Sequence, residues 1–318
     1  MKPPRPAAWR WAVPLVIALV TVVAFLPALQ NGFVNWDDLE NFLDNPRFRG
    51  LGADELGWMW TTTHLGHYVP LTWMTLGLDY LLWGLNPTGY HLTSLLLHAA
   101  NAVLLYFVAR RILGSSSTGP IALAAAFTAL LFSLHPLRVE SVAWATERRD
   151  VLSGFFSLLS VLCYLRRHDA SDERSRRRWY ALALVAALAA LLSKAVAATL
   201  PAVLLLLDVY PLRRLGGSAG WWTPAARRVF AEKLPFLLIA AAASILARSA
   251  LGQIPQLEAP GKIAVSAWSF GFYLWKTLVP LRLSPLYPMP ERIEPLAPRF
   301  LLAYAVIAAL ALVLWKLR

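Results

Sequence analysis

The sequence predicts an all-α, polytopic helical membrane protein. Its 318 residues are 58% hydrophobic, include 14 Trp and have a mean hydropathy of +0.53, which is too apolar for one water-soluble domain. Apolar runs alternate with short basic segments, the pattern that the positive-inside rule produces. We therefore interpret the formal net charge of +12 as membrane topology, and we do not expect nucleic acid as a partner.

The first apolar run, 11–29, is expected to be an uncleaved membrane span. At about 1.5 Å per residue it crosses a hydrocarbon core of roughly 30 Å, and no small-residue cleavage pattern precedes Asn31. Later runs bring the expectation to about eight spans, some of which need tilt or local bilayer thinning. They lie at about 90–109, 121–134, 151–165, 180–192, 196–209, 234–246 and 300–315.

Two further amphipathic segments are expected to be interfacial helices on the outer face. Segment 71–83 is short and contains Asp79, and segment 263–278 contains Lys276. Their aromatic and apolar side chains recur at helical spacing: Trp73, Leu76, Tyr80 and Trp83 in the first, and Trp268, Phe272 and Trp275 in the second.

The basic clusters predict the orientation. With the N-terminal segment inside, the inner side carries a net charge of +13 and the outer side −1. Both termini are then cytoplasmic, and a bacterial inner membrane is expected. The sequence predicts one membrane-embedded domain over 1–318, with an outer loop over 30–70 that includes a short helix, and a proline-rich outer segment over 249–299. The single cysteine, Cys163, permits no internal disulfide.

An acidic pair, Asp37 and Asp38, follows the first span directly. Carboxylates at a membrane surface can deprotonate a hydroxyl, bind a divalent cation or position an acceptor. Alternatively, they are simply solvated. We treat both as candidate catalytic residues, with Asp38 expected to handle the acceptor or a cation and Asp37 expected to hold the turn. No dedicated metal-binding or nucleotide-binding motif occurs elsewhere.

A second charged loop, 135–150, is expected on the same side. Arginine binds phosphate oxygens through a planar fork, so the basic residues of this loop are candidates for binding a donor phosphate. The alternative is that they pair with neighbouring carboxylates or anionic lipid. Lys194, at the outer end of a span, is a further candidate because a lysine among apolar residues needs a partner. The basic residues of the loop are Arg138, Arg148 and Arg149, and its carboxylates are Glu140, Glu147 and Asp150.

A polar stripe runs along the predicted helix 90–109. Its members are His91, Ser94, His98 and Asn101. Such stripes commonly provide hydrogen bonds between helices; the alternative is the lining of a cavity that receives an acceptor, together with His135 and Glu140.

With these residues, the chain resembles the membrane part of bacterial tetratricopeptide-repeat glycosyltransferase-like proteins, relatives of the transmembrane-and-TPR O-mannosyltransferases of the GT-C class. The resemblance rests on matches in the same order, from about residue 11 to 290. They are Asn31-Gly-Phe-Val-Asn-Trp-Asp-Asp38, Tyr68-Val-Pro-Leu-Thr72, Gly84-Leu-Asn-Pro-Thr-Gly-Tyr-His91, Leu97-His-Ala-Ala-Asn101, His135-Pro136, Glu147-Arg-Arg-Asp-Val-Leu-Ser153, Leu192-Ser-Lys194 and Leu206-Leu-Asp-Val-Tyr-Pro-Leu212.

The resemblance implies transfer of a sugar from a polyprenyl-phosphate donor, reached from the membrane lipids, to a protein or glycan acceptor on the outer face. It implies an acidic base at Asp37 or Asp38, and donor-phosphate contacts at Arg148 and Lys194. Two departures qualify it: animal relatives have Ser-Lys-Glu where this sequence has Ser193-Lys194-Ala195, and the tetratricopeptide repeats of the family are absent. The competing hypotheses are a non-catalytic scaffold that binds lipid-linked sugar, and a transporter.

Overall fold

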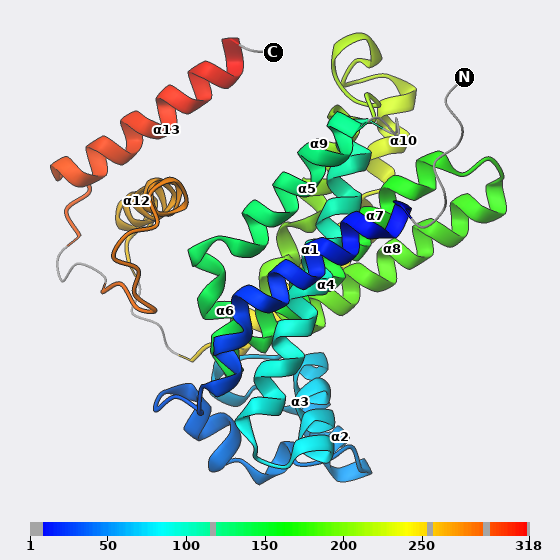
Figure 1. Ribbon diagram of the computed structural model, residues 1–318. Helices are drawn as coiled ribbons and strands as arrows, with labels where there is room; N and C mark the ends of the chain where they lie inside the picture. Colours follow the sequence, from blue (N-terminus) through cyan, green and yellow to red (C-terminus); the bar gives the residue numbers. More distant parts are fainter. Residues whose placement is uncertain (1–8, 115–118, 253–256, 289–292, 317–318) are drawn as a thin grey trace. The chain divides into compact units, whose positions relative to one another are not determined.

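The computed structural model describes residues 9–114, 119–252, 257–288 and 293–316, and its regular elements are helices (Figure 1). The chain divides into two compact units, Met1–Gly252 and Gln253–Arg318; that the whole chain is one membrane-embedded domain stays a prediction. The first unit has the helices α1 (Trp9–Phe25), α2 (Ala53–Thr61), α3 (Pro70–Trp83), α4 (Pro87–Leu113), α5 (Gly119–Leu134), α6 (Val139–Ala143), α7 (Arg148–Asp169), α8 (Glu173–Ser193), α9 (Leu200–Val209), α10 (Pro224–Ala231) and α11 (Leu234–Ala250). The second unit has α12 (Ala259–Leu278) and α13 (Pro298–Lys316).

Of the about eight spans expected from the sequence, the described residues show four or five candidates. All eight apolar runs are helical, but within the described residues only four helical stretches are long and apolar enough to cross a membrane. A fifth arises if the bent pair Gly119–Leu134 and Pro136–Ala143 forms one span. α7 and α8 are not among these stretches, because their charged ends leave uncharged helix of only about 15 residues, or roughly 22 Å. That is shorter than the hydrocarbon core of a bilayer. The four stretches are Trp11–Gln30, Pro87–Leu113, Pro224–Ala250 and Pro298–Lys316, and they indicate a multi-pass membrane protein.

Local sequence explains where several helices begin and end. α3 stops at Trp83 because Gly84 has a φ of 60°, a conformation that glycine adopts without strain. α4 then begins with Pro87 in its first turn, and the Asn86 side chain accepts a hydrogen bond from the Thr88 backbone N–H at 3.1 Å. Pro136 ends α5, and the chain bends by 56° before α6.

The helical bundle of the first unit has two main hydrophobic clusters. One joins α4, α7, α8, α9 and α11 through buried side chains that include Val108, Tyr164 and Phe236. The other joins α1, α4 and α5 through Ile17 and Tyr106. α4 belongs to both clusters, so it is the helix around which the bundle packs.

The segment between α1 and α4 is a folded cap (residues 26–86) with a core of its own. Figure 1 shows α2 and α3 together at one end of the bundle. The buried side chains of this core come from turns and from both helices: Phe42, Phe48, Met59, Val69, Trp73 and Leu76, with Tyr90 of α4. The expected short helix and the expected helix over 71–83 are therefore present, as α2 and α3. Both pack into the cap.

A buried ionic cluster lies where α9 ends and α11 begins. Figure 1 shows α10, which is between these two helices in the chain, at the end of the bundle opposite to α2 and α3. Asp208 of α9 is fully buried and pairs with Lys233 at 2.6 Å and with Arg214 at 2.8 Å. The Tyr164 hydroxyl lies 2.9 Å from the same carboxylate. The sequence motif around Asp208 thus serves to tie α7, α9 and α11 together.

In the second unit, α12 packs against α13. The expected interfacial helix over 263–278 lies within α12, and its Trp268 and Phe272 rings stack with centroids 5.0 Å apart. A hollow of about 490 Å³ is lined by Trp268, Phe272, Tyr287 and Phe300, among others. Pro290, in the proline-rich segment, lies outside the described residues.

Candidate functional site

The acidic loop that follows α1 is held in place by Asp38. Its carboxylate is fully buried, and Oδ2 accepts a hydrogen bond from the Val34 backbone N–H at 2.9 Å. Oδ1 accepts two more from Thr146, at 3.0 Å from the backbone N–H and at 2.6 Å from the hydroxyl. Asp38 thus makes the hydrogen bonds that hold the turn, the part that was expected of Asp37. A role for Asp38 in handling an acceptor or a cation stays a prediction.

Asp37 has the more accessible of the two carboxylates. Its side chain is half-buried, and within the described residues we find no hydrogen bond or ion pair for it. Its negative charge acts on His67 of the cap, together with the charges of Arg149 and Lys194. Of the acidic pair, Asp37 is thus the carboxylate without a hydrogen-bonding partner among the described residues.

A short turn, Ala145–Glu147, carries the second half of the site. Glu147 accepts from Arg149 at 2.5 Å on Oε1 and from Lys194 at 2.8 Å on Oε2. Lys194 also lies 2.5 Å from Asp150. Burial opposes ionisation of Glu147, but hydrogen bonds and positive charge from Arg149 and Lys194 outweigh it and lower the pKa of this carboxyl to about 2.

Lys194 therefore has the partners that its position requires. It lies between α8 and the 3₁₀ turn Ala195–Thr199, where the chain is extended. The two cations Lys194 and Arg149 and the two carboxylates Glu147 and Asp150 together carry no net charge. A phosphate bound here would have to compete with Glu147 and Asp150 for the cations.

Arg148 does not reach this group. Its side chain is fully buried and forms an ion pair with Asp79 of α3 at 2.7 Å. It also donates to the Ser94 hydroxyl at 2.9 Å and to the Tyr90 carbonyl at 2.6 Å. The structure thus gives Arg148 the role of joining α3, α4 and α7, and it places the side chain where a donor phosphate has no access. Of the two positions that the resemblance implied for the phosphate, Lys194 is the partly exposed one. It does not line the hollow described below.

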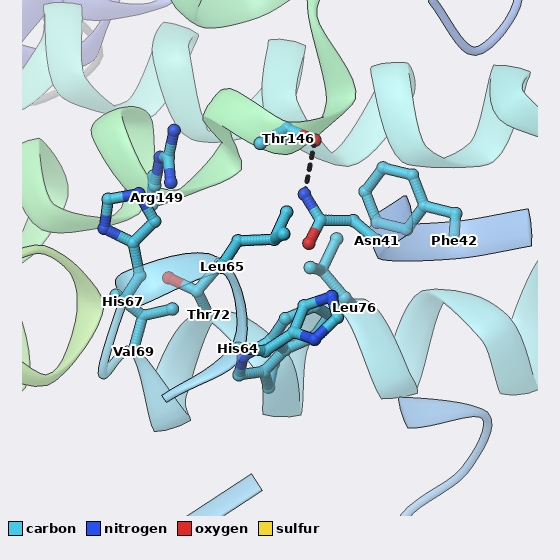
Figure 2. Close-up of a pocket in the computed structure, with 11 residues that line it drawn as sticks. Asn41, Phe42, His64, Leu65, His67, Val69, Thr72, Leu76, Thr146 and Arg149 are labelled. Carbon is cyan, nitrogen blue, oxygen red and sulfur yellow. Dashed lines mark hydrogen bonds between the residues drawn. The ribbon is translucent and has the colours of Figure 1, made fainter. Parts of the chain in front are cut away.

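A hollow of about 340 Å³, partly open to solvent, lies between the cap and the turn (Figure 2). Its polar lining comes from Asn41, His64, His67, Thr146 and Arg149. Figure 2 shows His67 next to Arg149 on one side and Asn41 hydrogen-bonded to Thr146 on the other. No sequence motif singles out Asn41, His64 and His67. Asn41 is far along the chain from the two histidines, and only the fold brings all three together.

Three features of the hollow favour a bound ligand. Burial and the charges of Arg149 and Lys194 lower the pKa of His67, against the charges of Glu147 and Asp37. Leu65, which Figure 2 shows between the two sides, has a φ of 49°, a left-handed conformation that is unusual for leucine. The buried indole N–H of Trp73, which also lines the hollow, has no acceptor among the described residues.

The polar stripe of α4 is buried and lies between helices. His98 Nε2 lies 2.9 Å from the Ser133 carbonyl of α5, and Asn101 donates to the Val151 carbonyl of α7 at 2.8 Å. Ser94 accepts from Arg148. His91 is fully buried close to the acidic loop, with Asp38 and the Gly32 backbone among its electrostatic neighbours. The contacts of His98, Asn101 and Ser94 are those of interhelical hydrogen bonding.

The remaining candidate residues lie around the bend between α5 and α6. The His135 side chain accepts a hydrogen bond from the Leu137 N–H at 3.2 Å and so starts the following turn. Arg138 stacks over the Phe132 ring at 5.1 Å, and Glu140 is exposed. None of the three lines the hollow, so a role for them in binding an acceptor stays a prediction.

No residues in the described ranges form a group of three or more His, Cys, Asp or Glu side chains suited to a metal ion. The hydrogen bonds of Asp38 already engage both of its oxygens. A cation shared by Asp37 and Asp38 also stays a prediction.

Comparison with known proteins gives partial matches to one group. The chain is 38% identical over 125 residues to the protein O-mannosyl-transferase tmtc2 of Xenopus laevis, which covers 38% of this chain and 14% of that protein. It is 32% identical over 207 residues to TMTC4 of Homo sapiens, covering 58% and 27%, and 34% identical over 207 residues to Tmtc2 of Drosophila melanogaster, covering 62% and 21%.

The aligned part is thus between 14% and 27% of the length of these curated relatives. No protein-family model matches the chain. No solved structure matches it either. The chain is therefore a distant, partial homologue of the TMTC protein O-mannosyl-transferases.

Proposed function

We propose that this chain is a GT-C-type membrane domain that transfers a sugar from a polyprenyl-phosphate-linked donor to a hydroxyl group on the outer face of the membrane. The observation that carries the proposal is the turn Ala145–Glu147. Thr146 of this turn binds the acidic loop through Asp38, and Glu147 binds Arg149 and Lys194. The turn thereby links the acidic loop to two cations, and its Thr146 and the cation Arg149 also line the hollow. The homology to protein O-mannosyl-transferases supports a mannose donor and a protein acceptor.

In this proposal Asp37 is the general base. It takes the proton of the acceptor hydroxyl as the acceptor oxygen bonds to the sugar's anomeric carbon. The bond from that carbon to the donor phosphate breaks, and the departing phosphate retains the electron pair. Lys194 and Arg149 stabilise the negative charge that develops on the phosphate oxygens, with Asp150, the more exposed carboxylate partner of Lys194, giving way to the phosphate.

Transfer from a radiolabelled polyprenyl-phosphate mannose to a serine- and threonine-containing peptide, in membranes, tests the proposal. Asp37→Asn is expected to reduce transfer by about 10²- to 10⁴-fold with an unchanged thermal midpoint of the solubilised protein. Asp44→Asn is the matched control, because Asp44 is an exposed carboxylate of the same cap. Asp38→Asn is expected to lower the thermal midpoint instead, since its carboxylate accepts three buried hydrogen bonds.

Equal transfer by wild type and Asp37→Asn would remove Asp37 from the chemistry. No transfer by the wild type, with retained binding of the donor, would favour the second candidate function, a scaffold that binds lipid-linked sugar without turnover. One observation favours that alternative: the carboxylates of Glu147 and Asp150 already neutralise the two cations.

A further inference from the structure

Thr146 makes three hydrogen bonds to the acidic loop and the turn that follows it. Its hydroxyl donates its one proton to Asp38 Oδ1 at 2.6 Å and accepts from the Asn41 side-chain amide at 3.0 Å. Its backbone N–H donates to the same Asp38 oxygen at 3.0 Å. Thr146 is buried, and both partners lie more than 100 residues earlier in the chain.

The next residue, Glu147, forms ion pairs with the two cations Arg149 and Lys194. Because Thr146 and Glu147 are adjacent in one 3₁₀ turn, a displacement of the turn moves the acidic loop and the pair Arg149 and Lys194 together. The bond from Asp38 to Val34 lies within the acidic loop itself. It can preserve the shape of that loop, but it cannot fix the loop's distance from the cations.

We infer that Thr146 is a positioning residue that sets the distance between the acidic loop and the cationic pair. The inference rests on the proposed function, in which Asp37 must hold the acceptor oxygen on the side of the anomeric carbon opposite to the departing phosphate. Misplacement by about 1 Å typically costs a factor near 10² in rate. The hydroxyl of Thr146 is already engaged by Asp38 and Asn41, so its effect is expected on turnover more than on donor binding.

The decisive comparison is between Thr146→Val and Thr146→Ser. Valine keeps the shape and the backbone N–H but removes the hydroxyl, whereas serine keeps the hydroxyl. Thr146→Val is expected to lower kcat by about 10- to 100-fold with the KM for the donor changed by less than about threefold, and Thr146→Ser is expected to stay within about threefold of the wild type. Thr128→Val, at an exposed threonine of α5 whose hydroxyl bonds only within its own helix, is the control.

Hydrogen exchange provides a readout that does not depend on activity. In Thr146→Val, the amides of segments 33–42 and 144–148 are expected to exchange faster, while those of α3 and of the Asp208 region stay protected as in the wild type.

Unchanged exchange in segment 33–42, or a kcat of Thr146→Val equal to that of the wild type, would overturn the inference. Failure of serine to restore kcat would also overturn it, because the role would then lie in shape. A wild type without transfer would overturn the proposed function, and the exchange comparison would still decide whether Thr146 fixes the loop.

Discussion

The two adjacent aspartates of the acidic loop have different environments, although nothing in their order along the chain distinguishes them. Asp38 turns inward and accepts hydrogen bonds from Val34 and Thr146, while Asp37 stays near the surface of the cap. The difference arises from the turn at Leu39–Leu43, which directs one of two neighbouring side chains into the protein. At this scale the sequence predicts that an acidic site exists, and the fold decides which carboxylate is available.

His67 is the residue whose protonation should be most informative. Its pKa in the folded protein is lowered by burial and by Arg149 and Lys194. Above about pH 6.5 the imidazole is neutral in both the folded and the unfolded chain and contributes nothing to pH dependence. Below that pH the unfolded chain binds a proton that the folded chain does not, so stability falls.

We therefore expect the thermal midpoint of the wild type to decrease relative to His67→Gln as the pH is lowered from about 7.5 to 5.5. Thermal unfolding of the two solubilised proteins over that range measures the effect. A midpoint difference that does not vary with pH would show that His67 titrates normally in the fold.

At the scale of helices, the pair Arg148 and Asp79 fixes the cap on the bundle. Arg148 is fully buried, so removing its charge leaves the Asp79 carboxylate buried without its cation. Arg148→Met is expected to destabilise the protein by about 3 to 5 kcal/mol, as measured by denaturant or thermal unfolding in detergent. The double variant Arg148→Met with Asp79→Leu should recover most of that loss, because no unpaired charge is left.

Arg47→Met is the control for this prediction, since Arg47 is an exposed cation of the cap. A single Arg148→Met variant as stable as the wild type would show that the ion pair does not secure the cap. If Arg148 instead binds a donor phosphate, the variant should lose donor affinity while it keeps its stability.

Helix positions were predictable from the sequence because apolar periodicity, Pro87 and Gly84 act locally. The partners of charged side chains were not. Arg148 was expected to pair within its own loop or to bind phosphate, yet its partner Asp79 is 69 residues away on a segment expected to lie in the membrane interface. Likewise, the charge pattern places Lys233 and Asp208 on the inner side, and only tertiary packing shows that they are buried together. Pairings of this kind depend on which helices meet, and periodicity carries no information about that.

At the scale of the whole molecule, the charge distribution predicts which end of the bundle faces the cytoplasm. The cap and the turn Ala145–Glu147 are expected outside, and the loop between α7 and α8 inside. Ser141 is a poor labelling site because it is buried and donates to Asp150 at 3.2 Å. Val139 and Ser171 are exposed and are therefore better positions for a cysteine in a thiol-labelling test of the orientation.

In a Cys163→Ser background, Val139→Cys is expected to react with a membrane-impermeant thiol reagent in intact cells, and Ser171→Cys only after the membrane is permeabilised. The background substitution is conservative in size at a buried free cysteine. Labelling of Ser171→Cys in intact cells would invert the topology and place the hollow on the cytoplasmic side.

The ion pair between cap and bundle also has a consequence for the time course of biosynthesis. Ribosomes add about 5 to 20 residues per second, so the 69 residues between Asp79 and Arg148 take roughly 3 to 14 s to synthesise. During that interval the cap has emerged from the ribosome without the guanidinium that neutralises its buried carboxylate. Asp79 must stay in contact with water until Arg148 arrives, so the cap matures seconds after its own residues are made. The cap is therefore expected to be most susceptible to proteolysis in that interval.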